Sequence, residues 1–155
     1  MQASLRHACL LVLHEIRRAV PDLVGRWEYF APDAVVVAEF TFQIQVSLPF
    51  EVILQLQQDA LCLGIGSMFW AEYFGPADLA DAQAQFRRAA LGILGGTMRV
   101  TESLRSERVV AADLQENDGT DWVRIAHTGE LHFPCGRRRE RCLMRSVTTS
   151  HGRRP

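Results

Sequence analysis

An aromatic run with one embedded carboxylate is the feature of this sequence that most directly suggests binding or chemistry. Four aromatic side chains fall within six positions: Phe69, Trp70, Tyr73 and Phe74. Aromatic residues are enriched at binding surfaces because they bury a large area at a small cost in conformational entropy. The simpler interpretation is that these rings fill the junction between a sheet and the following helix. The run therefore predicts either a part of the core or an aromatic contact surface.

Glu72 lies inside this run and is the first candidate for acid–base chemistry. Burial among the rings would raise the pKa of its carboxyl group and make it a general acid or base. In an extended segment, the same side chain can equally point to solvent. A hydrolase-type reaction through Glu72 is therefore one of two enzymatic hypotheses.

The second enzymatic hypothesis concerns the last third of the chain, which holds four residues of types that bind zinc. These are His127, His132, Cys135 and Cys142. Their spacing lacks the paired CxxC of a zinc finger, so we predict no metal site. Alternation places His127 on the face of Val123 and Ile125, which favours a hydrogen-bonded core histidine, although His127 and His132 together could also serve as acid and base. The chain has no lysine and no glycine-rich phosphate cradle, and we predict no cofactor.

Charge is divided unevenly along the chain. Residues 1–136 carry ten arginines against 17 acidic residues, a net of −7, and residues 137–155 carry seven arginines against one glutamate, a net of +6. An acidic group surrounds a predicted hairpin: Asp113, Glu116, Asp118, Asp121 and Glu130. Asp118 and Asp121 are its predicted contacts for a basic partner protein, although exposed hairpins are commonly acidic for solubility alone. The arginine-rich end lacks interleaved aromatics, so we interpret it as a solvated tail or protected sheet edge and not as a nucleic-acid site.

Two amphipathic helices are expected to position these residues. Apolar positions recur at helical spacing from Leu5 to Val20, and Ser4 is a candidate cap. In the second helix, Pro76 suits the first helical position and Gly95 with Gly96 suits the end. This pattern predicts helices over about 5–20 and 76–95.

Elsewhere the apolar pattern has a period of two, which indicates strands. The expected strands cover 27–30, 40–48, 51–57, 60–65, 98–104, 108–115, 122–128 and 142–148. Asn117, Asp118 and Gly119 favour a tight hairpin, and short connections imply antiparallel neighbours. The predicted fold is α+β: one antiparallel sheet of about six to eight strands covered by the two helices. Its order is helix, about three strands with 27–30 as a further short one, helix, three to five strands. It forms a single domain over 1–148, followed by a disordered basic tail at 149–155.

Composition is that of an ordinary globular protein, with 155 residues of which 48% are hydrophobic. Four sparse cysteines without a recognisable export signal favour thiols in a reducing cytoplasm. No apolar run approaches the roughly 18 residues of a membrane span, which predicts a soluble protein without membrane contact.

By elimination, we interpret the chain as a non-enzymatic bacterial interaction protein of the immunity, adaptor or chaperone-like kind. It would bind another protein through the acidic hairpin or the aromatic run. The first alternative is a small-ligand binder with an apolar pocket lined by Phe69, Trp70 and Tyr73 between the sheet and the helices. The second alternative is the enzyme that uses Glu72, or His127 with His132. An exposed final strand would also allow a homodimer to form by edge pairing.

Overall fold

The computed structural model describes residues 2–31, 33–74, 78–129 and 139–146. Two helices, α1 (Gln2–Ala19) and α2 (Leu79–Gly95), accompany two antiparallel sheets of five and four strands. The α+β class is therefore confirmed. No helix in the described part of the chain is long and apolar enough to cross a membrane.

The first sheet contains five consecutive strands. They are β1 (Gly25–Tyr29), β2 (Val36–Phe42), β3 (Val52–Gln57), β4 (Ala60–Ile65) and β5 (Phe69–Phe74), and each pairs with the next. The side chains of Phe40, Leu54 and Leu63 stand in register on three neighbouring strands and are at most 1% exposed. Because side chains alternate along a strand, these residues belong to one buried face of the sheet.

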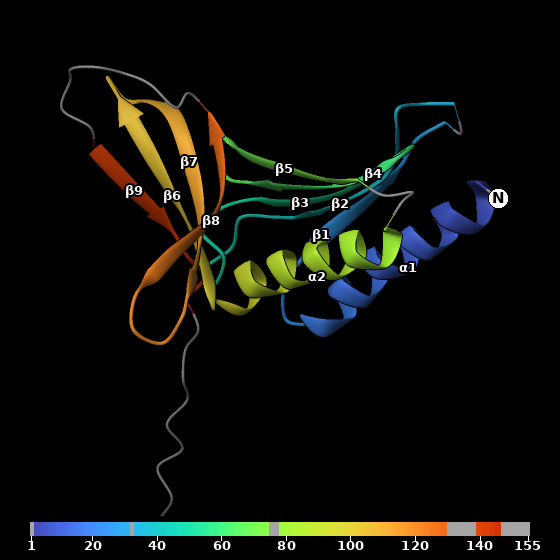
Figure 1. Ribbon diagram of the computed structural model, residues 1–155, viewed down its shortest axis with the longest axis horizontal. Helices are drawn as coiled ribbons and strands as arrows, with labels where there is room; N and C mark the ends of the chain where they lie inside the picture. Colours follow the sequence, from blue (N-terminus) through green and yellow to red (C-terminus); the bar gives the residue numbers. More distant parts are fainter. Residues whose placement is uncertain (1, 32, 75–77, 130–138, 147–155) are drawn as a thin grey trace, which may run out of the picture.

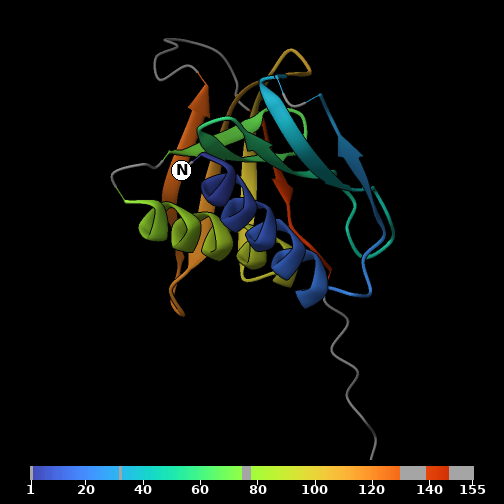
Figure 2. The same cartoon turned by 90° about the vertical axis from the view of Figure 1, so that its right-hand side faces the viewer.

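Both helices cover this buried face and lie side by side beneath the sheet (Figures 1 and 2). Leu13 and Ile16 of α1 and Phe86 and Ile93 of α2 are all fully buried. Their spacing of three or seven residues places each pair on one side of its helix, which is why these segments form amphipathic helices. The helices bury this stripe against the apolar face of the sheet and make the main core.

The second sheet stands across the end of the first (Figure 1). Its strands are β6 (Met98–Arg105), β7 (Arg108–Asn117), β8 (Trp122–Gly129) and β9 (Arg139–Leu143), in the order β8-β7-β6-β9. Hydrogen bonds from Thr128 in β8 to the backbone of Trp70 in β5 join the two sheets at one corner. This junction places β5, β8 and α2 around one open region of the molecule.

The prediction of a single sheet of six to eight strands is wrong, because nine strands divide between two sheets. The aromatic run is itself the strand β5, which the expected strand pattern omitted. The strand expected over 40–48 ends at Phe42, and Ile44 and Val46 beyond it are 70% and 100% exposed. The chain turns there because Gln45 bonds Leu48 across the turn, while its side-chain amide bonds both backbone groups of Val24.

The helix boundaries differ from the expected ones at their starts. The first helix begins at Gln2, so Ser4 is not its cap. The second begins at Leu79 with Asp78 as N-cap, so the helical start expected at Pro76 is wrong, and Pro76 itself lies outside the described residues. The predicted end is confirmed, since Gly96 has φ +77° and donates its backbone N–H to the last turn.

Of the two interpretations of the arginine-rich segment after residue 136, the sheet edge applies to residues 139–143, which form the edge strand β9 of the second sheet. The final strand lies at 139–143 instead of 142–148, because Arg141 within it pairs with the buried carboxylate of Glu102 in β6. Beyond β9, Arg145 binds the Leu94 carbonyl at the end of α2 and the carboxylate of Asp22. The disordered tail predicted at 149–155 lies outside the described residues.

Candidate functional site

The strand β5 divides the predicted aromatic run between two faces. Phe69 and Tyr73 point toward the helices, where Phe69 is 2% exposed and Tyr73 packs edge-to-face on Phe86 with ring centroids 5.6 Å apart. Burial raises the pKa of the Tyr73 hydroxyl to about 12. Trp70 and Phe74 lie on the opposite face together with Glu72. The run is therefore part core and part surface.

The apolar ligand pocket expected between the sheet and the helices does not bring its three residues together. Phe69 and Tyr73 share the helix side of β5, whereas Trp70 covers Gly64 on the other side, where an added Cβ would come within 2.8 Å of the indole. The small cavity beside Tyr73 and Leu79 holds only about 10 Å³. This volume accommodates about one water molecule.

The outer edge of β5 carries backbone groups that no strand in the described part of the chain pairs with, apart from the corner at Trp70. Thr128 accepts from the Trp70 N–H at 3.4 Å and donates to the Trp70 carbonyl at 2.8 Å, on the side away from β4. Backbone groups of alternate residues point the same way in an antiparallel sheet. The N–H and C=O of Glu72 and Phe74 therefore also point outward.

This free edge opens into a groove of about 700 Å³ between β5, α2 and the strands β7 and β8. Its floor is apolar, since Ala82, Ala89, Met98 and Leu114 are each at most 7% exposed. Two large apolar side chains, Phe74 at 60% and Ile125 at 45%, are exposed at its margins. The groove thus combines unpaired backbone groups with an apolar lining.

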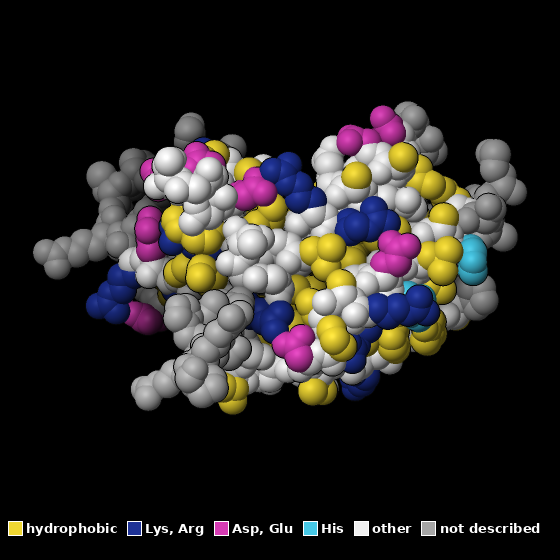
Figure 3. Space-filling model, turned by 90° about the horizontal axis from the view of Figure 1, so that it is seen from below, with side chains coloured by type: hydrophobic (Ala, Val, Ile, Leu, Met, Phe, Trp, Pro, Cys, Tyr) yellow, Lys and Arg dark blue, Asp and Glu magenta, His cyan; other side chains and the backbone are white. Residues whose placement is uncertain are grey.

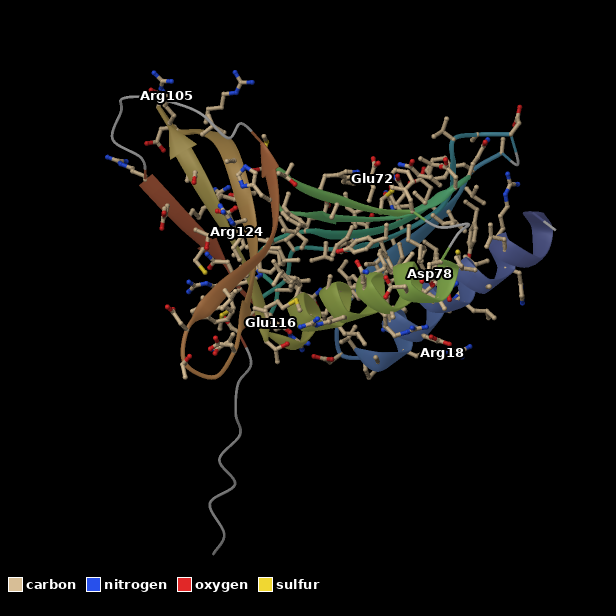
Figure 4. All side chains as sticks on the ribbon, viewed as in Figure 1. Arg18, Glu72, Asp78, Arg105, Glu116 and Arg124 are labelled. Atoms are coloured by element: carbon tan, nitrogen blue, oxygen red, sulfur yellow. The ribbon has the colours of Figure 1, made fainter. Side chains whose placement is uncertain are left out.

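Acidic side chains dominate the charges of the groove. Glu72 lies on β5 and Asp78 at the start of α2 (Figure 4), with Asp81 one turn further along the helix. Asp78 uses Oδ1 to cap α2, and Asp81 uses Oδ2 to accept from Gln85 at 2.6 Å. The second oxygen of each has no hydrogen bond among the described residues and remains available to a bound group.

Among the described residues that line the groove, the one basic side chain is Arg88, and it is already paired. Its guanidinium contacts the carboxylate of Glu116 through two nitrogens, with Nε at 3.3 Å from Oε1. Since this pair is neutral as a unit, three carboxylates set the charge of the groove. The site therefore favours a positively charged ligand.

The sequence predicts only some of the residues that line this groove. Glu72, Tyr73 and Phe74 are predicted contacts and do line the groove, but Asp78 and Asp81, which also line it, are not among the predicted contacts. Ile125 was assigned with Val123 to the face of a core histidine, whereas it sits at an irregularity in the pairing of β7 with β8 and is half exposed. The sequence signal for these residues is that an acidic helix start follows the aromatic run closely.

The predicted hairpin at Asp118 and Asp121 forms, but its acids serve the turn itself. Asp118 Oδ1 accepts from the backbone N–H groups of Thr120 and Asp121 and from the Thr120 hydroxyl, at 2.7 to 2.9 Å. These bonds lower the pKa of Asp118 to about 2. Gly119 supplies the left-handed turn with φ +98°. Asp121 binds the N–H of Trp122, so both carboxylates are engaged within the hairpin.

We expect Asp118→Asn to destabilise the protein in a pH-dependent way. The pKa of Asp118 is about 2 in the folded state against an ordinary value of 3.8, so its carboxylate stabilises the fold above about pH 4. That contribution disappears as the pH falls through 2. Melting temperatures from pH 6 to 2 should differ most between the variant and the parent protein above pH 4. A constant difference across this range would contradict the role of the carboxylate, and Glu140→Gln serves as the control for an exposed acid.

The residues of the remaining chemical hypotheses do not assemble into a second site among the described residues. His127 Nδ1 lies 2.6 Å from Asp113 Oδ1, while His132 and Cys135 lie outside those residues. No group of three metal-binding side chains occurs there either. Burial, with smaller effects from Glu72 and Asp59, raises the pKa of the Cys62 thiol to about 12 and keeps it protonated.

The described side chains of the helix face are of mixed kinds. Seen from below, its hydrophobic, arginine and acidic side chains are interspersed (Figure 3). The groove beside β5 is therefore the strongest candidate site.

No protein-family model, no curated protein and no solved structure matches this chain. The assignment of a function accordingly depends on the geometry of the groove.

Proposed function

We propose that this protein is an interaction module that binds an extended, basic segment of a partner protein by adding it as a strand to β5. The observation that supports this proposal is the free edge of β5, which opens into an acidic groove with an apolar floor. Strand addition uses backbone hydrogen bonds for affinity and side-chain pockets for specificity. Both components are available in this groove.

In the described part of the chain, the β5 edge carries few of the usual protections of a free strand. Natural edges are commonly blocked by proline or by charged residues, lysine above all, or covered by another element. Residues 70–74 contain neither proline nor lysine, their one charged side chain is Glu72, and among the described residues only Trp70, at the corner with β8, is engaged on the outer side. The open edge of β5 lies inside a groove and not on a flat surface. It can therefore pair with one added chain, while the walls of the groove hinder edge-to-edge pairing with a larger sheet.

Charge favours a foreign basic segment over a second copy of this chain. A symmetric dimer through β5 would use the same edge on both copies. It would bring the acidic residues Glu72, Asp78 and Asp81 of one copy close to the same three residues of the other copy. Like charges opposed across a pairing edge are destabilising, whereas a basic segment gains from the same carboxylates.

We expect Glu72→Pro to abolish binding without disrupting the sheet. Proline removes the outward N–H that would bond an added strand, and edge positions tolerate it because the β4 side loses no donor. A fluorescein-labelled host peptide of nine residues, alternating threonine with valine and carrying a central lysine, is the probe. Fluorescence anisotropy should show at least about a tenfold weaker affinity, a loss of about 1.4 kcal/mol.

Glu72→Gln is the matched control because it removes the charge but keeps the N–H. This variant should lose only the part of the affinity that comes from the Glu72 charge, and so less than the proline variant, and both variants should melt close to the parent protein. Equal affinities for the proline and glutamine variants would show that the β5 backbone is not the contact and would exclude strand addition.

A further inference from the structure

Side chains on the two faces of an added strand would contact different parts of the groove. This difference constrains the sequence of the partner segment. Directly opposed residues in antiparallel strands project to the same face. Residues of the added strand opposite Ala71 and Tyr73 would therefore project toward α2, and those opposite Glu72 and Phe74 toward the other face of the sheet. Only every second residue of the bound segment would therefore contact α2.

The helix surface beneath β5 is shaped for a long side chain with an apolar stem. Ala82 and Ala89 are small residues, 7% and 4% exposed, and they form the floor of the groove together with Met98. An apolar stem can lie on this floor as the stems of lysine and arginine do on other apolar surfaces. A short side chain would leave the floor uncovered.

The charged end of such a side chain meets carboxylates at the margin of the groove. Asp81 lies one residue before Ala82 on α2, and Asp78 caps the same helix. Each has one oxygen without a hydrogen bond among the described residues. The competing cation, Arg88, is paired with Glu116 at the far end of the groove. A cationic head placed between Asp78 and Asp81 would therefore form hydrogen bonds strengthened by charge.

From this geometry we propose that the partner segment presents lysine or arginine at the position that projects toward α2, with Asp78 and Asp81 as its recognition pair. The inference rests on the proposed strand addition and adds the side-chain specificity of that site. It assigns a class of partner: an extended segment with a long basic residue at the position that projects toward α2.

The test compares three guests at the central position of the alternating host peptide: lysine, norleucine and glutamate. Norleucine retains the stem of lysine but has no charge. On the parent protein, the lysine peptide should bind about tenfold more tightly than the norleucine peptide and more tightly still than the glutamate peptide. In the double variant Asp78→Asn with Asp81→Asn, the lysine preference should fall to about twofold or less.

The double variant is suited to this measurement because asparagine caps a helix as well as aspartate does, so α2 keeps its start. Glu140→Gln, which removes an exposed acid on β9, should leave the lysine preference unchanged. A lysine preference that survives intact in the double variant would overturn the recognition pair.

Failure of this inference differs from failure of strand addition. If the three peptides bind equally and Glu72→Pro weakens them all, the specificity proposal is overturned while strand addition is supported. If Glu72→Pro weakens none of them, both proposals are overturned. Analytical ultracentrifugation tests whether a second copy of this chain occupies the β5 edge instead. A dimer that Glu72→Pro dissociates, and that the peptides do not displace, would assign the edge to that second copy and overturn both proposals.

Discussion

Arg141→Met is expected to lower the free energy of unfolding by about 3–5 kcal/mol, the cost of leaving one member of a buried ion pair without its partner. Arg141 lies on β9, and its Nε donates to Glu102 Oε2 at 2.8 Å. Urea denaturation followed by tryptophan fluorescence measures the change. An effect of this size is a large fraction of the roughly 5–15 kcal/mol by which native domains are stable.

The burial of Glu102 explains this magnitude. Its side chain is fully buried, although that of Arg141 is half exposed. The other carboxylate oxygen accepts from the hydroxyl and the backbone N–H of Ser67, at 3.1 and 3.3 Å. Glu102 therefore joins β6 to β9 and to the turn before β5, and without the guanidinium it would be an uncompensated charge in the interior.

Two controls separate this buried pair from ordinary surface electrostatics. Arg139 lies on the same strand and pairs with Glu107 at 3.1 Å, but both side chains are about 80% exposed. Arg139→Met should change stability by less than about 1 kcal/mol, because exposed pairs contribute little. Adding Glu102→Gln to Arg141→Met should recover part of the loss, since it removes the stranded charge. Equal effects of Arg139→Met and Arg141→Met would contradict the argument.

Local patterns predicted much of the secondary structure because they depend on neighbours in sequence. The end of α2 at Gly96 and the hairpin at Gly119 follow from backbone conformations that glycine adopts readily. The number of sheets could not be predicted in the same way. Alternation identifies the buried face of a strand but not its neighbour, and the division after α2 depends on contacts such as Thr128 with Trp70, 58 residues apart.

The strand β5 was not predicted, and β9 was predicted at displaced bounds, for different physical reasons. In β5, rings occupy both faces, since Phe69 and Tyr73 face the core while Trp70 covers Gly64 outside, so the strand shows no clean alternation. The β9 segment reads as solvated because it is rich in arginine. Its order depends on Glu102, whose complete burial no local pattern reveals.

The candidate site was predicted in part. The aromatic run supplies one wall of the groove, but the other walls come from α2 and from β8, up to about fifty residues further along the chain. The acidic hairpin looked equally suitable in sequence. Only the structure shows that Asp118 Oδ1 takes three hydrogen bonds within its own turn, whereas Asp78 and Asp81 line a groove with an apolar floor.

Phe86→Ala is expected to destabilise the protein by about 3–5 kcal/mol, as truncation of a buried phenylalanine in a close-packed core does. Phe86 is fully buried and its ring meets Tyr73 edge-to-face, which fixes α2 beneath β5. Its removal leaves a cavity at the contact that sets the width of the groove. Urea denaturation measures the loss, and a change below about 1 kcal/mol would show that α2 does not depend on this contact.

Phe74→Ala also replaces phenylalanine with alanine, but at a ring that is 60% exposed. Comparing the two variants separates effects on stability from effects on binding. Because little of this ring is buried, the loss of stability should stay below about 1 kcal/mol. Its position at the margin of the groove should instead make it matter for binding, with the lysine host peptide weakened about fivefold, an effect of about 1 kcal/mol. An exposed phenylalanine that affected neither stability nor binding would contradict the placement of the partner segment along β5. A stable Phe74→Ala variant with impaired binding would instead show that the exposed half of the aromatic run contacts the partner while the buried half holds the core.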